Sequence, residues 1–361
     1  MAYTNIDDPS AYFQTALWTG TNAKDKVITN DGNSDLQPDL IWAKARTSTS
    51  YTDNHFIVDS SRGRLKGLVP NDTSAETTTT GNESQQAERD LQSFDTDGFT
   101  VGIVNSTAAL NASSASNVAW QWKVNGGTTT SLSSNINSVC QVNQDAGISI
   151  VKYTCTGGGN GQSVQHGLGL VPQVIITKNR TDTNYSDWIT YHHILTKDNF
   201  VKLNSNAASA TNSPYNGAAP TSSTYNVSID LVEATKDYVS YVFAPIQGYS
   251  KFGSYVGNGN ANGPFVYTGF KPACIILKKS SSTGNWRIFD NKRAGYNDDN
   301  YRLTPNENSA ESTATHLDIL SNGFKLRNTG ASYNGSGDTF IYMAWAENPF
   351  TTSTGIPTTA R

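Results

Sequence analysis

The sequence predicts an all-β protein made of three tandem antiparallel β-sandwich or jelly-roll repeats. Of its 361 residues 16% are charged and 10% are aromatic, and Ser, Thr, Asn and Gly are abundant, as in β proteins with many turns. Two strand motifs each recur three times along the chain, which indicates internal duplication. Segments with helical spacing are almost absent, so we expect little helix.

The first repeated motif is a Pro followed six residues later by a Lys, with an apolar triplet between them. The three copies of the motif end at Lys44, Lys178 and Lys278. Each run is too short for an ordinary helix and rich in β-branched residues, which predicts a strand buried on both faces. We expect each Lys to end its strand in water and to discourage pairing between sheet edges. Binding of an anion or a sugar acid by these lysines is the alternative.

The second repeated motif is a strand with a large apolar residue at every second position. It closes each copy, at 118–122, 239–243 and 341–345. A period of two places these side chains on one face of a sheet. Burial stabilises by about 1.5–3 kcal/mol per large side chain before entropy is subtracted. We therefore expect each copy to bury this face in a core of its own.

Two further features recur between these strands. An aromatic strand occurs at 55–59, 188–192 and 286–290. Turns at Asp97-Gly98 and Asn322-Gly323 each precede an aromatic residue, and such dipeptides supply the positive φ that tight hairpins need. Each unit of about 100–120 residues therefore holds at least five or six short strands, the content of a sandwich or jelly roll.

The alternation of apolar residues stops at two joints, which define the boundaries of the predicted domains. The first joint, a linker at 125–137, is rich in Gly, Ser and Thr, so we expect it to be flexible. The second joint is much shorter, and we expect copies two and three to be packed more rigidly than copies one and two. The polar insertion at 71–89 is predicted to be an exposed loop. The boundaries are an N-terminal docking segment at 1–15, repeats at 16–124, 138–246 and 247–350, a linker at 125–137 and a C-terminal tail at 351–361.

Charge and cysteine content limit the partners and the compartment. A net charge of −4 without a local basic run gives no general attraction to nucleic acid. The sequence shows neither a secretory leader nor a stretch approaching the roughly 20 apolar residues of a membrane span, so we expect synthesis in a cytoplasm and no membrane insertion. Three cysteines, Cys140, Cys155 and Cys274, cannot all pair within one molecule, and we expect them to be reduced and structural.

Cofactor and metal motifs are weak. The glycine-rich runs at 157–161 and 257–263 are followed by predicted strands and not by the helix that a phosphate site needs, so they are interpreted as hairpin turns. Adjacent His192 and His193 point to opposite faces of a strand and cannot share one metal ion by that geometry. Asp95 to Gly98 lacks the downstream Glu of a calcium loop and is interpreted as a turn. We expect neither a cofactor nor a metal ion.

Catalytic residues are equally weakly indicated, and the binding candidates are aromatic. Asp59 and Asp290 occupy the same repeat position, so a catalytic acid pair would have to form between copies, and we favour a protein without enzymatic activity. Single tyrosines in predicted loops could stack on sugar rings, although a lone loop Tyr more commonly packs locally. These candidates are Tyr185, Tyr215, Tyr296 and Tyr333.

Four phrases of the sequence, Asp7–Gly20, Ser93–Gly102, Gly248–Tyr255 and Ala346–Phe350, resemble a family of virion proteins of marine bacteriophages. The resemblance covers nearly the whole chain. It implies a protein on the surface of a phage particle with lectin-like sandwich repeats, and it carries over no catalytic or binding residue.

The resemblance and the composition together favour a tail-associated fibre or adhesion protein that binds host surface glycans without enzymatic activity. Polar, Tyr-rich loops suit shallow recognition of this kind. The alternative is a capsid decoration protein, or another structural particle protein, without receptor binding of its own. A glycan-cleaving enzyme is the third and weakest reading. For either virion role we expect homo-oligomers, contacts with other tail or capsid proteins, and a location on the particle after synthesis in the host cytoplasm.

Overall fold

Antiparallel sheets hold nearly all of the regular structure in the computed structural model of this chain. Strands account for 44% of the residues and helices for 3%, which confirms the all-β prediction. The structure describes residues 3–358, apart from 79–89, 105–108, 158, 183–185, 213, 229–230, 232, 295–296 and 298. None of the helices within these described residues is long and apolar enough to span a membrane.

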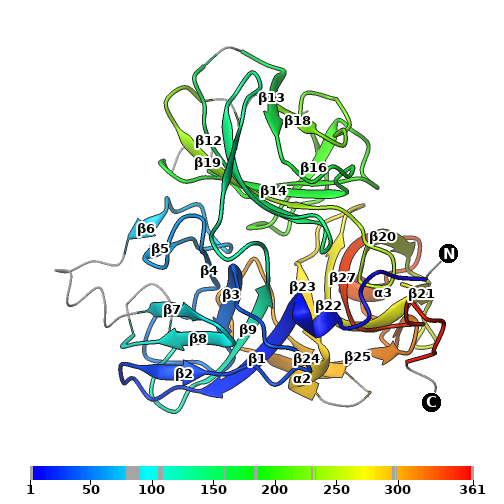
Figure 1. Cartoon of the computed structure of the whole chain (residues 1–361). Coiled ribbons are helices and arrows are strands. Elements are labelled where there is room, and N and C mark those ends of the chain that lie inside the picture. Colours follow the sequence, from blue (N-terminus) through cyan, green and yellow to red (C-terminus); the bar gives the residue numbers. More distant parts are fainter. Residues whose placement is uncertain are drawn as a thin grey trace.

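One order of four antiparallel strands occurs in each of the three copies (Figure 1). In every case the closing strand lies between the opening strand and the Pro-to-Lys strand, because both of these pair with it. Copy one contains β1 (Phe13–Thr19), β9 (Ser116–Trp122), β3 (Leu40–Ala45) and β4 (Phe56–Asp59) in that order. Copy two contains β12 (Ile148–Thr154), β19 (Asp237–Phe243), β14 (Val174–Asn179) and β15 (Ile189–His192). Copy three contains β20 (Ser250–Val256), β27 (Thr339–Pro349), β22 (Phe270–Lys279) and β23 (Arg287–Asp290).

Each copy also carries a second, separate sheet. Copy one uses β2 (Lys26–Ile28), β8 (Gly98–Val101) and β7 (Leu91–Asp95), copy two uses β13 (Gln162–Gln165) and β18 (Thr224–Val227), and copy three uses β21 (Phe265–Tyr267), β26 (Gly323–Leu326), β25 (Ser312–Leu320) and β24 (Asp299–Arg302). The first sheet of copy two is extended to eight strands by β10 (Thr130–Leu132), β11 (Ser138–Asn143), β16 (Asn199–Lys202) and β17 (Ala210–Thr211). The remaining elements are β5 (Lys66–Gly67), β6 (Thr77–Thr78), the 3-10 helix η1 (Pro9–Ala11), α2 (Asn291–Ala294) and α3 (Ala331–Asn334).

The two hairpins predicted at Asp-Gly and Asn-Gly form, and one of them has the predicted positive φ. Asp97-Gly98 connects β7 to β8, and Gly98 has a φ of +101°. Asn322-Gly323 joins β25 to β26, but Gly323 does not adopt a positive φ. The two glycine-rich runs connect β12 to β13 and β20 to β21, so strands follow them as expected, but the interpretation as hairpin turns is wrong because each run connects two different sheets. Short-range turn chemistry therefore places the β7–β8 and β25–β26 hairpins without help from the rest of the fold.

The first sheet of each copy turns one face toward a common centre. Large side chains from all three closing strands meet there and belong to one cluster of buried residues. The ring centres of Trp122 and Trp345 lie 5.2 Å apart, those of Phe243 and Trp345 lie 5.5 Å apart, and those of Trp122 and Phe243 lie 6.4 Å apart. The prediction of a separate core behind each closing strand is therefore wrong, because one copy alone cannot cover this face.

The opposite faces of the same sheets are buried locally. In copy one, Ile41 and Ala119 pack in a separate cluster with Phe99 of the second sheet. In copy two, Ile175 and Val242 do the same in a cluster of their own. In copy three the corresponding residues are continuous with the central cluster. The alternation along each strand thus divides its side chains between a shared core and an outer core.

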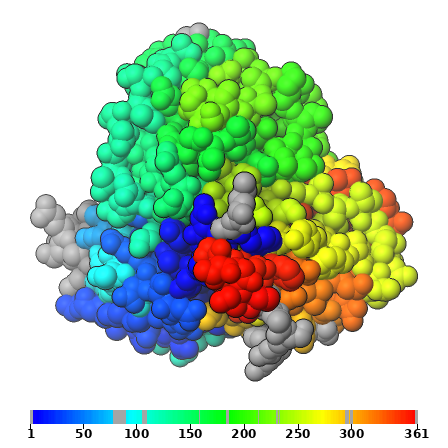
Figure 2. Space-filling model, turned by 45° about the vertical axis from the view of Figure 1, so that its right-hand side comes forward, coloured from blue at the N-terminus to red at the C-terminus, as the bar shows by residue number. Residues whose placement is uncertain are grey.

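The N-terminal segment lies on copy three of its own chain. Tyr3 donates its hydroxyl to the carbonyl of Gly269 at 2.6 Å, and the ring of Phe13 stacks on Trp345 at 6.0 Å between ring centres. Ser353 donates from its backbone and its side chain to the carboxylate of Asp7, both at 2.6 Å. Both ends of the chain accordingly lie beside copy three (Figure 1), and the blue N-terminal residues border the red C-terminal ones (Figure 2). The segment predicted to dock on other proteins therefore closes the ring of three copies.

The predicted flexible linker is held at both of its ends. The backbone amides of Gly126 and Gly127 donate to the carboxylate of Asp39, each at 3.0 Å. Farther along, β10 pairs with β11 and so joins the sheet of copy two. Its Gly and Ser content supplies turn geometry and small side chains, and the freedom that this composition suggests is removed by hydrogen bonds to copies one and two.

Candidate functional site

The three lysines of the Pro-to-Lys strands are buried, which contradicts the prediction that they reach water. Lys44, Lys178 and Lys278 are each 0% exposed. Their amines donate to backbone carbonyls: Lys44 to Ala45 at 2.6 Å, Lys178 to Thr73 at 3.2 Å and to Ser186, and Lys278 to Asn206, Lys279 and Gly284 at 3.3, 2.7 and 2.8 Å. Burial lowers the pKa of all three amines to about 8. They act as internal donors and are not open to a solvent-borne anion.

Two of these lysines bind carbonyls of a neighbouring copy. The acceptor Thr73 belongs to copy one, whereas Lys178 belongs to copy two. In the same sense, Lys278 of copy three reaches Asn206 of copy two. The segment that follows the aromatic strand of a copy (β4, β15 or β23) is thus an arm against which the next copy packs. The described part of the predicted loop 71–89 belongs to the arm of copy one.

A second set of side chains links the copies in a cycle. Trp188 of copy two donates its indole N–H to Val69 of copy one at 2.9 Å, and Trp286 of copy three donates to Lys202 of copy two at 2.9 Å. His55 of copy one completes the cycle through Nε2, which lies 3.0 Å from the carbonyl oxygen of Thr304 in copy three. Since all three begin the aromatic strand recognised in the sequence, this repeated position is an interface position.

The two tyrosine candidates that the structure describes are also buried. Tyr215 is 1% exposed, and its hydroxyl contacts Thr177 Oγ1 at 3.0 Å and the carbonyl of Ile189 at 3.1 Å. Tyr333 lies in α3 and is 5% exposed. The prediction that they stack on sugars from exposed loops is therefore wrong, because both rings are buried within their copies. Tyr185 and Tyr296 lie outside the described residues.

Asp59 is the centre of a buried charge network between copies one and two. Its carboxylate accepts from Arg62 Nε at 2.5 Å and from the Tyr241 hydroxyl at 2.8 Å. Arg62 also pairs with Glu76 at 2.8 Å, and Glu76 in turn pairs with Arg180 of copy two at 2.8 Å. Two acids and two arginines therefore neutralise one another across the interface.

Asp290 is the centre of the same network between copies three and one. Its carboxylate accepts from Arg293 Nε at 2.6 Å and from the Trp120 indole at 3.0 Å. Arg293 pairs with Glu311 at 2.7 Å, and Glu311 pairs with Arg46 of copy one at 2.7 Å. Asp59 and Asp290 are each 0% exposed, and an arginine occupies each carboxylate. Asp59 and Asp290, the two acids that an acid-catalysed mechanism would need, are thus buried in ion pairs between copies.

The interface between copies two and three has the same backbone hydrogen bond as the other two interfaces, but different side chains at every position of the charge network. The amide of Ser209 donates to Ser280 O at 3.0 Å, as Glu76 does to Arg180 O and Glu311 to Arg46 O. His192 stands where the other copies have Asp, since it pairs with the first residue of the apolar triplet as Asp59 and Asp290 do. The full neutral set is His192, Leu195, Ser209, Ser280 and Met343. Charged and neutral versions of one interface therefore coexist in the same ring.

Histidines, cysteines and metal ligands give no site in the described residues. The Nε2 atoms of His192 and His193 lie 3.1 and 3.0 Å from the carbonyl oxygens of Tyr342 and Phe252, and their rings stack with centres 5.2 Å apart. All three cysteines are buried, and none of them forms a disulfide with another described residue. Across the described ranges there is no group of three His, Cys, Asp or Glu side chains able to hold a metal ion.

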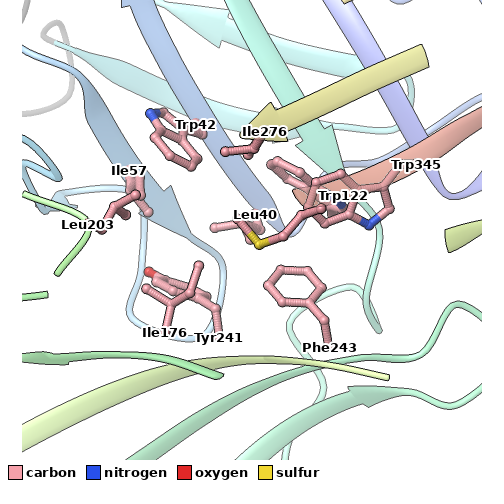
Figure 3. A pocket seen from close by; sticks show the side chains of 11 residues that line it. Leu40, Trp42, Ile57, Trp122, Ile176, Leu203, Tyr241, Phe243, Ile276 and Trp345 are labelled. Carbon is pink, nitrogen blue, oxygen red and sulfur yellow. The ribbon is translucent and has the colours of Figure 1, made fainter. Parts of the chain in front are cut away.

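A small apolar cavity of about 20 Å³ lies where the three copies meet (Figure 3). Its volume is roughly that of one water molecule, and its walls offer no polar surface, so it is a packing void and not a ligand site. The side chains that line it come from every copy: Leu40, Trp42, Ile57, Trp122, Ile176, Leu203, Tyr241, Phe243, Ile276, Met343 and Trp345.

An exposed aromatic pair was missed by the sequence reasoning. Phe265 and Tyr267 alternate along the edge strand β21 and are 46% and 49% exposed. Lys251 Nζ lies 5.0 Å from the centre of the Tyr267 ring. Their signal in the sequence is the alternation Phe-Val-Tyr, in which Val266 points inward and is 6% exposed. Two aromatic rings on one face of an edge strand form a surface on which a sugar ring can stack.

These features define a class of protein: an all-β block in which three copies of one unit close around a common core. The chain belongs to the family described as "Domain of unknown function (DUF7483)", whose model matches residues 8–349. That match spans all three copies, so the unit of the family is the complete ring. A search of curated proteins and a search of solved structures each returned no match.

Proposed function

We propose that this chain is a non-enzymatic structural protein on the surface of a bacteriophage particle. The resemblance of four phrases to virion proteins supports a particle location. The observation that carries the structural role is the meeting of Trp122, Phe243 and Trp345 in one core, which makes three copies into a single block. A block of this kind suits a position of threefold symmetry in a particle, on the capsid or on the tail.

The buried charge networks support the non-enzymatic part of this proposal. Asp59 and Asp290 are the acids that a glycan-cleaving enzyme would have used, and each is paired with an arginine inside an interface. A general acid or nucleophile needs access to its substrate. These two acids serve instead to hold neighbouring copies together.

The experiment that tests the proposal is to locate the chain in a density map of the intact particle. A surface position on the capsid or the tail is the expected result. An internal position beside the genome, or absence of the chain from purified particles, contradicts it. The symmetry at the site distinguishes a capsid decoration role from a role in the tail.

Host glycan binding, as by a tail fibre or adhesion protein, is the second candidate, and the exposed pair Phe265 and Tyr267 favours it. Exposed aromatic rings can stack on a sugar ring, and Lys251 lies beside them with its amine donating to the carbonyl of Tyr267 at 2.9 Å. Host cell-surface glycans would then be the ligand, and other tail proteins would be the partners.

A glycan array with purified chain tests this second candidate. Replacing Phe265 and Tyr267 by Ala should abolish binding at a modest loss of stability, because only about half of each ring is buried. Val27→Ala, which removes an apolar side chain 59% exposed on copy one, is the control and should bind normally. Absence of binding to any host glycan, or equal binding by the double variant, would contradict glycan binding at this surface, and only the structural role would remain.

A further inference from the structure

Copy three contains a cluster of three basic side chains around one aromatic ring. We call it the Arg-Tyr cluster, and it consists of Arg287 of β23, Arg302 of β24, His316 of β25 and Tyr333 of α3. The guanidinium carbons of Arg287 and Arg302 lie 5.4 and 5.6 Å from the centre of the Tyr333 ring. The ring centre of His316 lies 4.6 Å from the same point, and Arg302 donates to the Tyr333 hydroxyl.

Several donors of the cluster are buried without a partner. His316 is 1% exposed, and neither of its ring nitrogens has a hydrogen-bond partner in the described part of the chain. Arg287 is 6% exposed, and its Nε likewise has none. A buried polar group that lacks a partner costs about 1–3 kcal/mol, and more if it is charged. Such groups call for a ligand that supplies acceptors.

The charge of the cluster is not balanced by an ion pair. Among the described residues neither Arg287 nor Arg302 lies within 4.0 Å of a carboxylate oxygen. Glu307 is the acid that attracts both, but its carboxylate accepts from Asn285 and Ser309 instead. Burial, and then the two arginines, lower the pKa of His316 to about 4, so its ring is neutral and has one N–H to donate.

The other two copies fill the same place with apolar groups. Arg287 corresponds by strand register to Phe56 in copy one and to Ile189 in copy two. Arg302 corresponds to Gly67, because the next residues, Leu303 and Leu68, bridge to Ile288 and Ile57 respectively, and a Cβ on Gly67 would lie 2.1 Å from a ring carbon of Phe56. In copy one the Phe56 ring thus occupies the space that an arginine enters in copy three. Folding of this unit therefore does not require the basic residues.

We propose that the Arg-Tyr cluster is a binding site for an oxyanion, namely a carboxylate or a sulfate group. The planar guanidinium of Arg matches two oxygens of such a group, and the free Arg287 Nε and a His316 N–H add further donors. A bound anion offsets the cost of burying two positive charges. Arg302 is the only one of the four that is partly exposed, so the proposed anion would approach on its side. The site does not depend on the proposed location in a particle, but a role for it in recognising acidic sugars of the host rests on the second proposed function.

The ligand test uses the purified full chain with sodium sulfate and sodium glucuronate, each compared with sodium chloride at equal ionic strength. We expect sulfate, glucuronate or both to raise the melting temperature in a saturable way, and titration calorimetry to give one site per chain. Saturation by sulfate alone identifies a free inorganic anion, and saturation by glucuronate identifies a sugar acid. A response equal to that of chloride for both anions overturns the proposal.

Variants assign the effect to the cluster. Arg302→Ala should weaken binding about 10- to 100-fold, the value of a charged hydrogen bond. Arg287→Phe together with Arg302→Gly restores the pair found in copy one and should abolish binding while raising the melting temperature without anion. Arg327→Ala removes an equal charge from an exposed ion pair with Asp318 in the same copy and should bind normally. Unchanged binding by Arg302→Ala overturns the assignment even if the double variant does not fold.

Discussion

Trp120 of copy one donates its indole N–H to the carboxylate of Asp290 in copy three, at 3.0 Å and out of contact with solvent. The aromatic residue of the closing strand and the acid of the aromatic strand come from different copies, and Tyr241 and Asp59 repeat the relationship at the next interface. Both halves of each pair were recognised in the sequence as repeat positions. Their partnership across copies is what joins the units.

The first prediction concerns the charged interface between copies one and two. Arg62→Leu should cost about 3–5 kcal/mol of unfolding free energy, because it leaves Asp59 buried without its counter-ion. Replacing the whole network by the set found between copies two and three should cost less than this single change. The full replacement is Asp59→His, Arg62→Leu, Glu76→Ser, Arg180→Ser and Tyr241→Met.

Urea unfolding of the wild type, the single variant and the fivefold variant measures the difference. Arg327→Ala is the control for loss of an exposed arginine, and it should change the unfolding free energy by about 0.5 kcal/mol or less. If the fivefold variant loses as much unfolding free energy as the five single substitutions added together, the five positions do not act as a unit.

The second prediction concerns the N-terminal segment that closes the ring. Phe13→Ala should destabilise by about 3–5 kcal/mol, because the ring packs between Trp122 and Trp345. Leu17→Ala changes a residue of the same strand that is 40% exposed and should cost far less. Both are measured by urea unfolding. Equal losses of unfolding free energy in the two variants would mean that the Phe13 side chain does not hold the three copies together.

The third prediction is a pH dependence from the buried lysines. Their folded pKa of about 8 lies below the ordinary value of 10.5, so the unfolded chain binds more protons than the folded one between these values. The unfolding free energy should therefore rise with pH from about 8, by up to about 1.4 kcal/mol per pH unit for each lysine. Above about pH 10 the trend should reverse, since burial raises the pKa of Tyr215 and Tyr255 and the folded state keeps their protons.

Urea unfolding between pH 7 and 9.5 checks this window. Lys44→Met should lower the slope of the rise by about one third, and Lys44 is the best choice because its loss leaves one carbonyl, that of Ala45, without its donor. Lys197→Met is the matched control, since the side chain of Lys197 is 59% exposed. A flat profile in the wild type would show that the three amines are not neutralised in the folded state.

The fourth prediction concerns the thiols. Cys140, Cys155 and Cys274 are buried, and burial raises the pKa of Cys140 to about 11. A thiol reagent at pH 8 should therefore leave the native protein unlabelled and modify three thiols per chain after unfolding in urea. Fast labelling of the native chain, or fewer than three thiols in urea without reductant, would contradict the burial or the absence of a disulfide.

The candidate site shows where sequence reasoning stops. The Pro-to-Lys pattern places Lys44 correctly at the end of its strand. The pattern does not distinguish an amine that is exposed to water from a buried amine that donates to backbone carbonyls. Tyr333 was selected as a loop residue although it fills a core. The alternation of Phe265, Val266 and Tyr267 does not identify the two aromatics as exposed, because a period of two gives two faces and does not say which one faces solvent.

What the sequence determined by itself is local: the strands, the hairpins at Gly98 and Gly323, and the threefold recurrence of one unit. These depend on side-chain alternation and backbone conformation, which act over a few residues. The tertiary structure alone decided that the faces of Trp122, Phe243 and Trp345 share one core. A period of two shows that a face is buried, but the surface that covers it comes from residues more than a hundred positions away, whose proximity no local pattern records.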